Sequence, residues 1–75
     1  MPVNYCDYFQ SRQSHPLSNK EKKFCRWIDH VEKTVIQQTG LHLLDLQDEM
    51  YMVHFEEGLT PSQMAQIVID SFVSW

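Results

Sequence analysis

The sequence predicts a small all-α domain of three main helices, and three observations support this prediction. Apolar residues recur at the three- and four-residue spacing of one helical face. Two segments, starting at Ser18 and Thr60, have the Ser/Thr-x-x-Glu/Gln pattern of a capping box, which marks the start of a helix. Both glycines of the chain stand where such helices would end. We therefore expect helices over about residues 19–39, 46–57 and 61–73.

The first predicted helix, over residues 19–39, has a signal at each end. We expect the Ser18 hydroxyl to accept a hydrogen bond from the Glu21 amide, while the Glu21 carboxylate accepts one from the Ser18 amide. Gly40 follows the last turn, where a left-handed residue commonly ends a helix. The apolar face of this helix consists of Phe24, Trp27, Ile28, Val31, Val35 and Ile36.

The second predicted helix follows a leucine-rich connector. Four of the six residues 41–46 are leucine, so we expect this segment to cover one end of the core. Asp45 is a good N-cap, and Asp48 and Glu49 would lie in the first turn, where the helix dipole favours acidic side chains. These signals predict a helix over about residues 46–57.

The third predicted helix, over residues 61–73, has the clearest start. Thr60 would cap it, Pro61 suits the first helical position, and Gln63 completes the capping box. Its apolar side chains cover an arc of roughly 240°, which is wider than the stripe that one neighbouring helix buries. We therefore expect this helix to have two neighbours, and a second copy of the chain is a candidate for one of them.

Residues 1–17 leave two interpretations open. Asn4 is able to cap a short helix with aromatic residues on one side, which Pro16 would end. A loose arm held by the same aromatic residues fits nearly as well. Residues 18–75 are predicted to form a single helical domain. Its predicted core consists of Phe24, Trp27, Ile28, Val31, Val35, Leu43, Leu44, Leu46, Val53, Phe55, Met64, Ile67, Val68 and Phe72.

Composition and charge exclude several classes of protein. The chain has 75 residues, a net charge of −4 and 43% hydrophobic residues, which is a globular composition. Two glycines cannot build a phosphate-binding loop, and no apolar run approaches the roughly 20 residues that span a membrane. The first residues lack the basic start and apolar stretch of a secretory signal. We therefore expect a cytoplasmic protein, no membrane partner, and reduced thiols rather than a Cys6–Cys25 disulfide.

No residue pattern indicates a metal site, a cofactor or catalysis. Structural zinc sites use closely spaced pairs of Cys or His, whereas the two cysteines stand alone and the four histidines are twelve or more residues apart. Cys25 and His30 would point about 140° apart on their helix. Adjacent acids such as Glu56 and Glu57 diverge by about 100° and are not a preset acid–base pair. We expect no catalytic residue, no metal ion and no cofactor, and a buried, unreactive thiol at Cys25.

Charge is distributed unevenly along the chain. Residues 1–33 hold all six basic side chains and four acidic ones, whereas residues 34–75 hold six acidic side chains and no basic one. Three lysines start the first predicted helix and two glutamates end the second, where the helix dipole disfavours each by about 0.3–1 kcal/mol. Two explanations stay open. Either Glu56 or Glu57 meets Arg26 within an antiparallel helix hairpin, or these charges face a partner.

Two segments of the chain carry a recognisable pattern. Residues 39–48 read Thr-Gly-Leu-His-Leu-Leu-Asp-Leu-Gln-Asp, and residues 55–61 read Phe-Glu-Glu-Gly-Leu-Thr-Pro. With the preceding tryptophan helix, they resemble small uncharacterised proteins of bacterial phages and plasmids over about residues 24–70. Gln47 departs from that pattern, which has proline there. The resemblance implies a mobile-element setting, in which small acidic proteins bind and inhibit host factors such as defence nucleases. It implies no catalytic residue.

Three functional hypotheses compete, and we favour the first. It is a non-enzymatic protein-interaction module, an adaptor or accessory protein that self-associates as a homodimer. Its predicted self-association residues are Met64, Ile69, Val73 and Trp75. The second is an acidic inhibitor of a host nucleic-acid-handling or defence protein, with a role like that of anti-restriction or anti-CRISPR proteins. Its predicted protein-binding residues are Asp48, Glu49, Glu56 and Glu57.

The third hypothesis is a DNA-binding regulator. Residues 58–65 resemble the start of the first helix of a helix-turn-helix motif, and a basic cluster could bind anions. The motif requires a recognition helix after residues 61–73, which the sequence does not provide, and the acidic balance opposes phosphate binding. We therefore rank nucleic acid last among the partners. The predicted anion-binding residues are Lys20, Lys22, Lys23 and Arg26.

Overall fold

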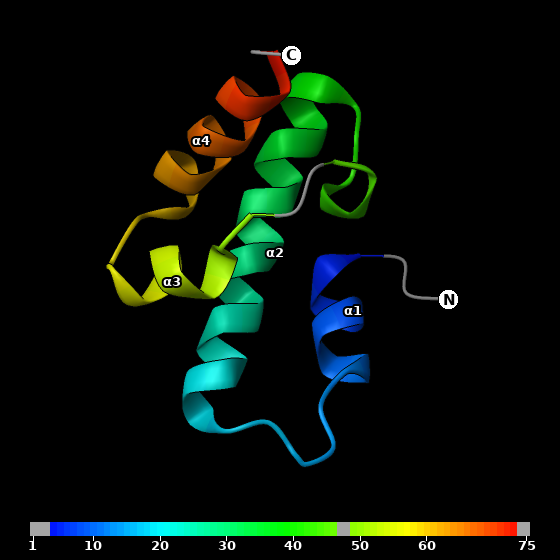
Figure 1. The fold of residues 1–75 in the computed structure, drawn as a ribbon, viewed down its shortest axis with the longest axis vertical. Helices are drawn as coiled ribbons and strands as arrows, with labels where there is room; N and C mark the ends of the chain where they lie inside the picture. Colours follow the sequence, from blue (N-terminus) through cyan, green and yellow to red (C-terminus); the bar gives the residue numbers. More distant parts are fainter. Residues whose placement is uncertain (1–3, 47–48, 74–75) are drawn as a thin grey trace.

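The computed structural model describes residues 4–46 and 49–73 of the chain. In this part of the chain the backbone forms four α-helices and one short 3-10 helix, and it contains no strand (Figure 1). The elements are α1 (Tyr5–Ser11), α2 (Asn19–Thr39), η1 (Leu43–Asp45), α3 (Tyr51–Glu56) and α4 (Pro61–Val73). The predicted all-α fold is confirmed, and of the two interpretations of the N-terminal segment the short helix is the one observed.

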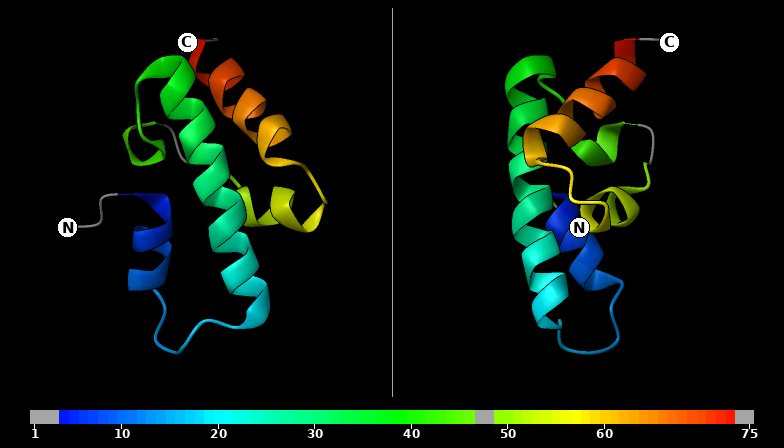
Figure 2. Two further views of the ribbon diagram at one scale, coloured as in Figure 1. Left: turned by 180° about the vertical axis from the view of Figure 1, so that it is seen from behind. Right: turned by 90° about the vertical axis from the view of Figure 1, so that its left-hand side faces the viewer.

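The long helix α2 is the centre of the fold, because α1, α3 and α4 all pack against it. In Figure 1, α1 lies on one side of α2, while α3 and α4 lie on the other. α4 runs beside the second half of α2, and the two helices end at the same end of the molecule (Figure 2). α3 crosses α2 instead of running back along it, so the expected antiparallel hairpin is not formed.

Local hydrogen bonds start α2 and α4 at the predicted positions. The Ser18 amide donates to Glu21 Oε1 at 2.9 Å, and the Glu21 amide donates to Ser18 Oγ at 3.2 Å. The same reciprocal pair joins Thr60 and Gln63, at 2.9 and 3.2 Å. Gly40 has a φ of 76° and ends α2 in the left-handed conformation that glycine adopts without strain. The bounds predicted for these two helices are therefore confirmed.

The prediction of a continuous helix over residues 46–57 is wrong. The chain instead forms η1 and then a six-residue α3 that starts only at Tyr51. Asp45 does not cap an α-helix, because its carboxylate accepts the His42 amide within η1 at 3.3 Å. Leu43 is buried in the core, and its amide is bound by a side chain of α2. This contact holds the connector against α2, so that the next helix begins later than its local sequence suggests.

The core lies between α2, α4 and the elements that cover them, and it differs from the predicted set at several positions. Leu44, Val53 and Phe72 were expected inside but are 39%, 44% and 42% exposed. Tyr51 and Ala65 are buried although they were not expected to be. The later start of α3 explains part of this change, because Tyr51 faces the core and Val53 then points outward. The buried apolar residues are Phe24, Cys25, Ile28, Val31, Val35, Leu43, Tyr51, Met64, Ala65 and Val68. The other predicted core residues, Trp27, Leu46, Phe55 and Ile67, are partly buried.

Two further groups of contacts connect the elements to α2. Phe24 lies at the centre of an aromatic cluster, with ring centroids 4.9 Å from Phe9 of α1 and 5.5 Å from Phe55 of α3. The Glu32 carboxylate is 3% exposed and accepts the amide of Tyr5 at 3.3 Å and that of Leu43 at 3.1 Å. One buried side chain of α2 thus holds the first turn of α1 and the start of η1.

Candidate functional site

The acidic residues predicted to bind a protein do not form one surface. Glu56 and Glu57 lie at the C-terminal end of α3, whereas Glu49 is half-buried before its first turn. Glu56 pairs with Lys20 at 2.8 Å, and Glu57 lies 3.1 Å from His54 Nδ1. Asp48 lies outside the described residues. Among Glu49, Glu56 and Glu57, which the structure describes, only the two adjacent glutamates lie together, and each already has a basic neighbour.

The predicted basic cluster is also divided. Lys20 faces Glu56, so the intramolecular pairing that we considered exists, but it uses Lys20 where Arg26 was expected. The difference arises because α3 is short and crosses the first half of α2. Lys22 and Arg26 line a cavity between α1 and α2, and Lys23 is exposed on α2. Both partners of the Lys20–Glu56 pair are about half exposed, so the pair stabilises the fold by at most about 1 kcal/mol.

The prediction that Met64 takes part in self-association is wrong. It is fully buried between α4 and α2, so a second chain cannot reach it in this fold. Ile69 is half-buried, and Val73 is 67% exposed. Trp75 lies outside the described residues. Of the three predicted self-association residues that the structure describes, Val73 is the one whose side chain is largely exposed.

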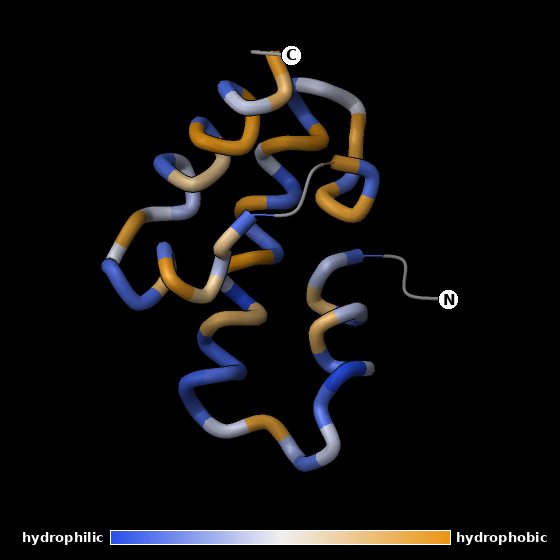
Figure 3. The backbone as a smooth tube through the Cα atoms, in the orientation of Figure 1, coloured by the Kyte–Doolittle hydropathy of each residue, from blue (hydrophilic) through white to orange (hydrophobic). Residues whose placement is uncertain are grey.

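Exposed apolar side chains gather at two places in the described part of the chain. Phe72 and Val73 form the last turn of α4, which we call the α4 apolar end. Met50 and Val53, three residues apart, face outward at α3. Figure 3 shows that α4 and η1 are rich in hydrophobic residues, whereas the chain between α1 and α2 and the start of α2 are mostly hydrophilic. The exposure of Phe72 could not be predicted from the sequence, because the helical spacing puts this residue on the buried face of α4.

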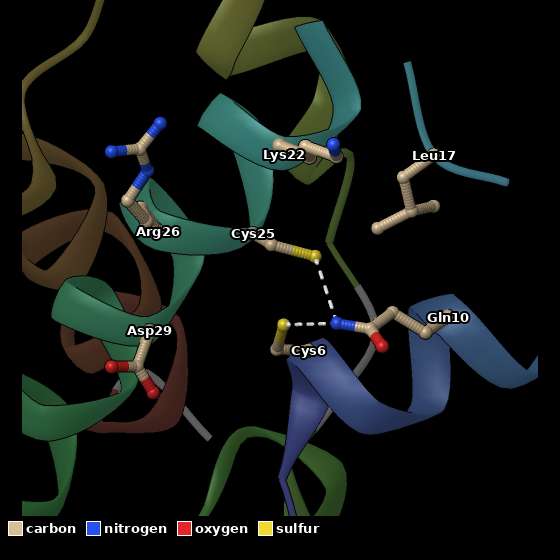
Figure 4. A pocket seen from close by; sticks show the side chains of 7 residues that line it. All are labelled: Cys6, Gln10, Leu17, Lys22, Cys25, Arg26 and Asp29. Carbon is tan, nitrogen blue, oxygen red and sulfur yellow. Dashed lines mark hydrogen bonds between the residues drawn. The ribbon is translucent and has the colours of Figure 1, made fainter. Parts of the chain in front are cut away.

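A cavity of about 470 Å³ lies between α1 and α2, and the two cysteines face it together (Figure 4). Gln10 Nε2 lies 3.2 Å from Cys6 Sγ and 3.8 Å from Cys25 Sγ, so that a single amide group is in contact with both sulfur atoms. Burial and a hydrogen bond with the Cys25 thiol raise the pKa of Cys6 to about 11. Both thiols are free. The residues that line the cavity are Cys6, Gln10, Leu17, Lys22, Cys25, Arg26 and Asp29.

A second cavity, of about 310 Å³, lies between α1 and the connector. It is lined by two tyrosines and three leucines, namely Tyr5, Tyr8, Leu43, Leu44 and Leu46. Two of these residues, Tyr5 and Leu43, are the ones whose backbone amides Glu32 binds. No local pattern predicts this cavity, because its residues come from segments more than thirty positions apart.

Within residues 4–46 and 49–73, no three His, Cys, Asp or Glu side chains come together as a metal ion would require. The buried carboxylate of Glu32 has its oxygens turned to two backbone amides, with His42 Nδ1 3.9 Å from Oε2. Such a carboxylate positions backbone segments rather than a reacting group. In the same residues, no helix combines the length and the apolar character that crossing a membrane would need.

Comparison with known proteins yields no relative. No protein-family model matches the chain, and neither a curated protein nor a solved structure matches it. The similarity to phage and plasmid proteins therefore stays a prediction from the residues 39–48 and 55–61. Any function has to be argued from the surfaces and cavities described above.

Proposed function

We propose that this chain is a non-enzymatic protein-interaction module whose binding surface is the α4 apolar end. The observation that carries the proposal is the position of Phe72. It follows Val68 by four residues and Ala65 by seven, so it continues the face of α4 that α2 buries. Nevertheless 42% of Phe72 is exposed, because α2 and α4 end together at the edge of the molecule.

Burying this end against another surface is favourable. Full burial of an apolar side chain of this size contributes about 1.5–3 kcal/mol, and because Phe72 is 42% exposed, covering the rest gains less than half of that. Val73 lies beside Phe72 in the same turn and is 67% exposed, so it adds to the gain. Aromatic residues in such positions are common at the energetic centres of interfaces. A second copy of this chain is the first partner to consider, because an isologous dimer would cover both apolar ends at once. The mobile-element setting implied by the resemblance belongs to this proposal and is compatible with an adaptor role.

Sedimentation velocity over a range of concentrations tests the proposal. We expect the chain to dimerise and the variant Phe72→Lys to remain monomeric under the same conditions. Gln66→Lys is the matched control, because it adds the same charge to an exposed position of α4 away from the apolar end. A dimer that persists in Phe72→Lys contradicts the proposed surface.

If the chain is monomeric throughout, the same variants are compared for capture of other proteins from a lysate of the source organism at low and high salt. An apolar interface keeps its partner at high salt, whereas binding through Glu56 and Glu57 is lost. Capture that Glu56→Lys/Glu57→Lys abolishes and Phe72→Lys does not would replace this proposal with the acidic inhibitor. A partner lost only in Phe72→Lys supports the interaction module.

A further inference from the structure

Cys6 and Cys25 lie nineteen positions apart in the sequence but meet in the fold. Cys6 comes from the first turns of α1 and Cys25 from the second turn of α2. In Figure 4 both sulfur atoms point toward the Gln10 amide, at 3.2 and 3.8 Å from its nitrogen. The two thiols are also close enough for Cys25 to help raise the pKa of Cys6. Two sulfurs that share one nitrogen at these distances and line the same cavity are near enough for side-chain rotation and a small shift of α1 to bring them to the bonding distance of a disulfide.

Access to the two sulfurs is unequal, which sets an order of reaction. Cys6 is partly exposed in the cavity, whereas Cys25 is only 6% exposed. A reagent in the cavity therefore meets Cys6 first, and Cys25 is placed to attack the product formed there. Lys22 and Arg26 line the cavity on either side of Cys25 (Figure 4), and the carboxylate of Asp29 in the same lining is paired with Lys33. Asp7 adds one negative charge near Cys6, so the basic groups around the two thiols outnumber the acidic ones. This lining favours an anionic reagent.

We propose that Cys6 and Cys25 form a modification site that closes to a disulfide by exchange with an anionic low-molecular-weight disulfide, for which glutathione disulfide is the probe. The Cys6 thiolate attacks one sulfur of the reagent and releases one thiolate, which takes up a proton from water. The Cys25 thiolate then attacks Cys6 Sγ of this mixed disulfide and releases the second reagent thiolate. Two protein thiols are thereby oxidised to one disulfide, and the reagent disulfide is reduced to two thiols. Two electrons pass from the protein to the reagent, so the reaction needs no other oxidant.

The bond would join α1, which has no fully buried residue, to the centre of the fold. None of the seven residues of α1 is fully buried, so α1 depends on partly buried contacts with α2. Closing a ring of about twenty residues restricts the unfolded chain, and we expect the oxidised protein to melt about 10–20 °C above the reduced one. The site therefore links the redox state of the surroundings to the attachment of α1.

The reaction should be slow at neutral pH. Only the thiolate attacks, and the pKa of Cys6 is about 11, so little thiolate is present at pH 7. We expect the rate of the first step to rise about tenfold per pH unit from about pH 7 to pH 9 and beyond, whereas an ordinary cysteine levels off near its pKa of about 8.5. A plateau near pH 8.5 would show that Cys6 is not held in the partly buried position beside Cys25 that raises its pKa.

The test follows the reduced full-length chain with glutathione disulfide by intact mass and by thermal melting. We expect the wild type to lose two hydrogens as a monomer and to melt at higher temperature. Cys25→Ala should stop at one bound glutathione, and Cys6→Ser should react far more slowly because Cys25 is buried. Stable glutathione adducts on the wild type, disulfide-linked dimers alone, or no reaction of the folded chain at pH 9 would each overturn the proposal.

A matched pair of variants tests the role of the cavity lining. Lys22→Gln should slow the reaction with glutathione disulfide about twofold or more at low ionic strength, but leave the rate with a neutral disulfide such as hydroxyethyl disulfide unchanged. Lys23→Gln removes the same charge from the neighbouring exposed position, which does not line the cavity. Equal slowing in both variants, or slowing with the neutral reagent, contradicts selection of an anionic reagent at this site.

Discussion

The two sides of α2 are held by different means. On the α4 side, Met64, Ala65 and Val68 are buried against α2, so this interface is a continuous apolar core. On the α1 side no residue of α1 is fully buried, and the helix is attached by aromatic edges, a backbone amide bound to Glu32 and the two thiols. A small domain can thus be stabilised mainly by one pair of packed helices, while another helix is attached by a few polar and aromatic contacts.

The largest effect should follow a cavity in the α2–α4 core. Met64→Ala is expected to lower the free energy of unfolding by about 2–5 kcal/mol, because Met64 is fully buried. Urea denaturation followed by circular dichroism measures this change. Val73→Ala shortens an exposed side chain of the same helix and should stay within about 0.5 kcal/mol. Similar losses in both variants would mean that the buried contacts between α2 and α4 do not carry the stability of this side of α2.

The next largest effect should follow loss of the Glu32 carboxylate. Glu32→Ala leaves the amides of Tyr5 and Leu43 without their acceptor and should cost about 1–3 kcal/mol. Glu32→Gln keeps one acceptor oxygen and should cost less. Hydrogen exchange at residues 5 and 43 locates the effect, because both amides should lose protection in Glu32→Ala. Loss of protection at only one of them would disprove the shared attachment.

Substitutions at the N-caps of α1 and α2 should differ in how much of the molecule they destabilise. Asn4 caps α1 and Ser18 caps α2, and replacing either by Ala removes one side-chain acceptor, which costs about 1 kcal/mol. In Ser18→Ala this loss should appear in global unfolding, because α2 carries the core. In Asn4→Ala we expect faster hydrogen exchange in α1 alone. Equal global losses in both variants would show that α1 unfolds together with the rest.

The start of α2 should also show a defined dependence on pH. The hydrogen bond from the Ser18 amide holds the pKa of Glu21 below its ordinary value of 4.5. The stabilisation by the ionised carboxylate is therefore present above pH 4.5 and is lost as pH falls through the lowered folded-state pKa. We expect wild type to exceed Glu21→Gln in melting temperature near neutral pH and to lose that advantage in acid. An advantage that grows in acid would contradict this sign.

The smallest effect should come from the charge pair between α2 and α3. Lys20→Ala is expected to change the free energy of unfolding by no more than about 1 kcal/mol, because both partners are exposed to solvent. The change should shrink further in high salt. Thermal melting at low and high ionic strength measures it. A large, salt-independent loss would instead place α3 among the elements that carry the core.

Sequence patterns predicted the parts of the fold that are decided locally. The bounds of α2 and α4 follow from hydrogen bonds between residues three apart, as in Ser18 with Glu21, so they can be read from the sequence. The start of α3 could not be predicted in this way, because it depends on the hydrogen bond between the Leu43 amide and Glu32, which belongs to another element. For the same reason the spacing of residues on α4 could not show that Phe72 is left uncovered, nor that Cys6 would reach Cys25.

The way in which Glu32 is used has a consequence for how freely the chain can vary. Its two partners are backbone amides, which every residue except proline supplies. Changes of side chain at positions 5 and 43 therefore leave these hydrogen bonds available, and neither position can compensate for a change at position 32. A saturation mutagenesis profile should accordingly show position 32 as sharply restricted, while positions 5 and 43 accept several apolar residues and reject proline.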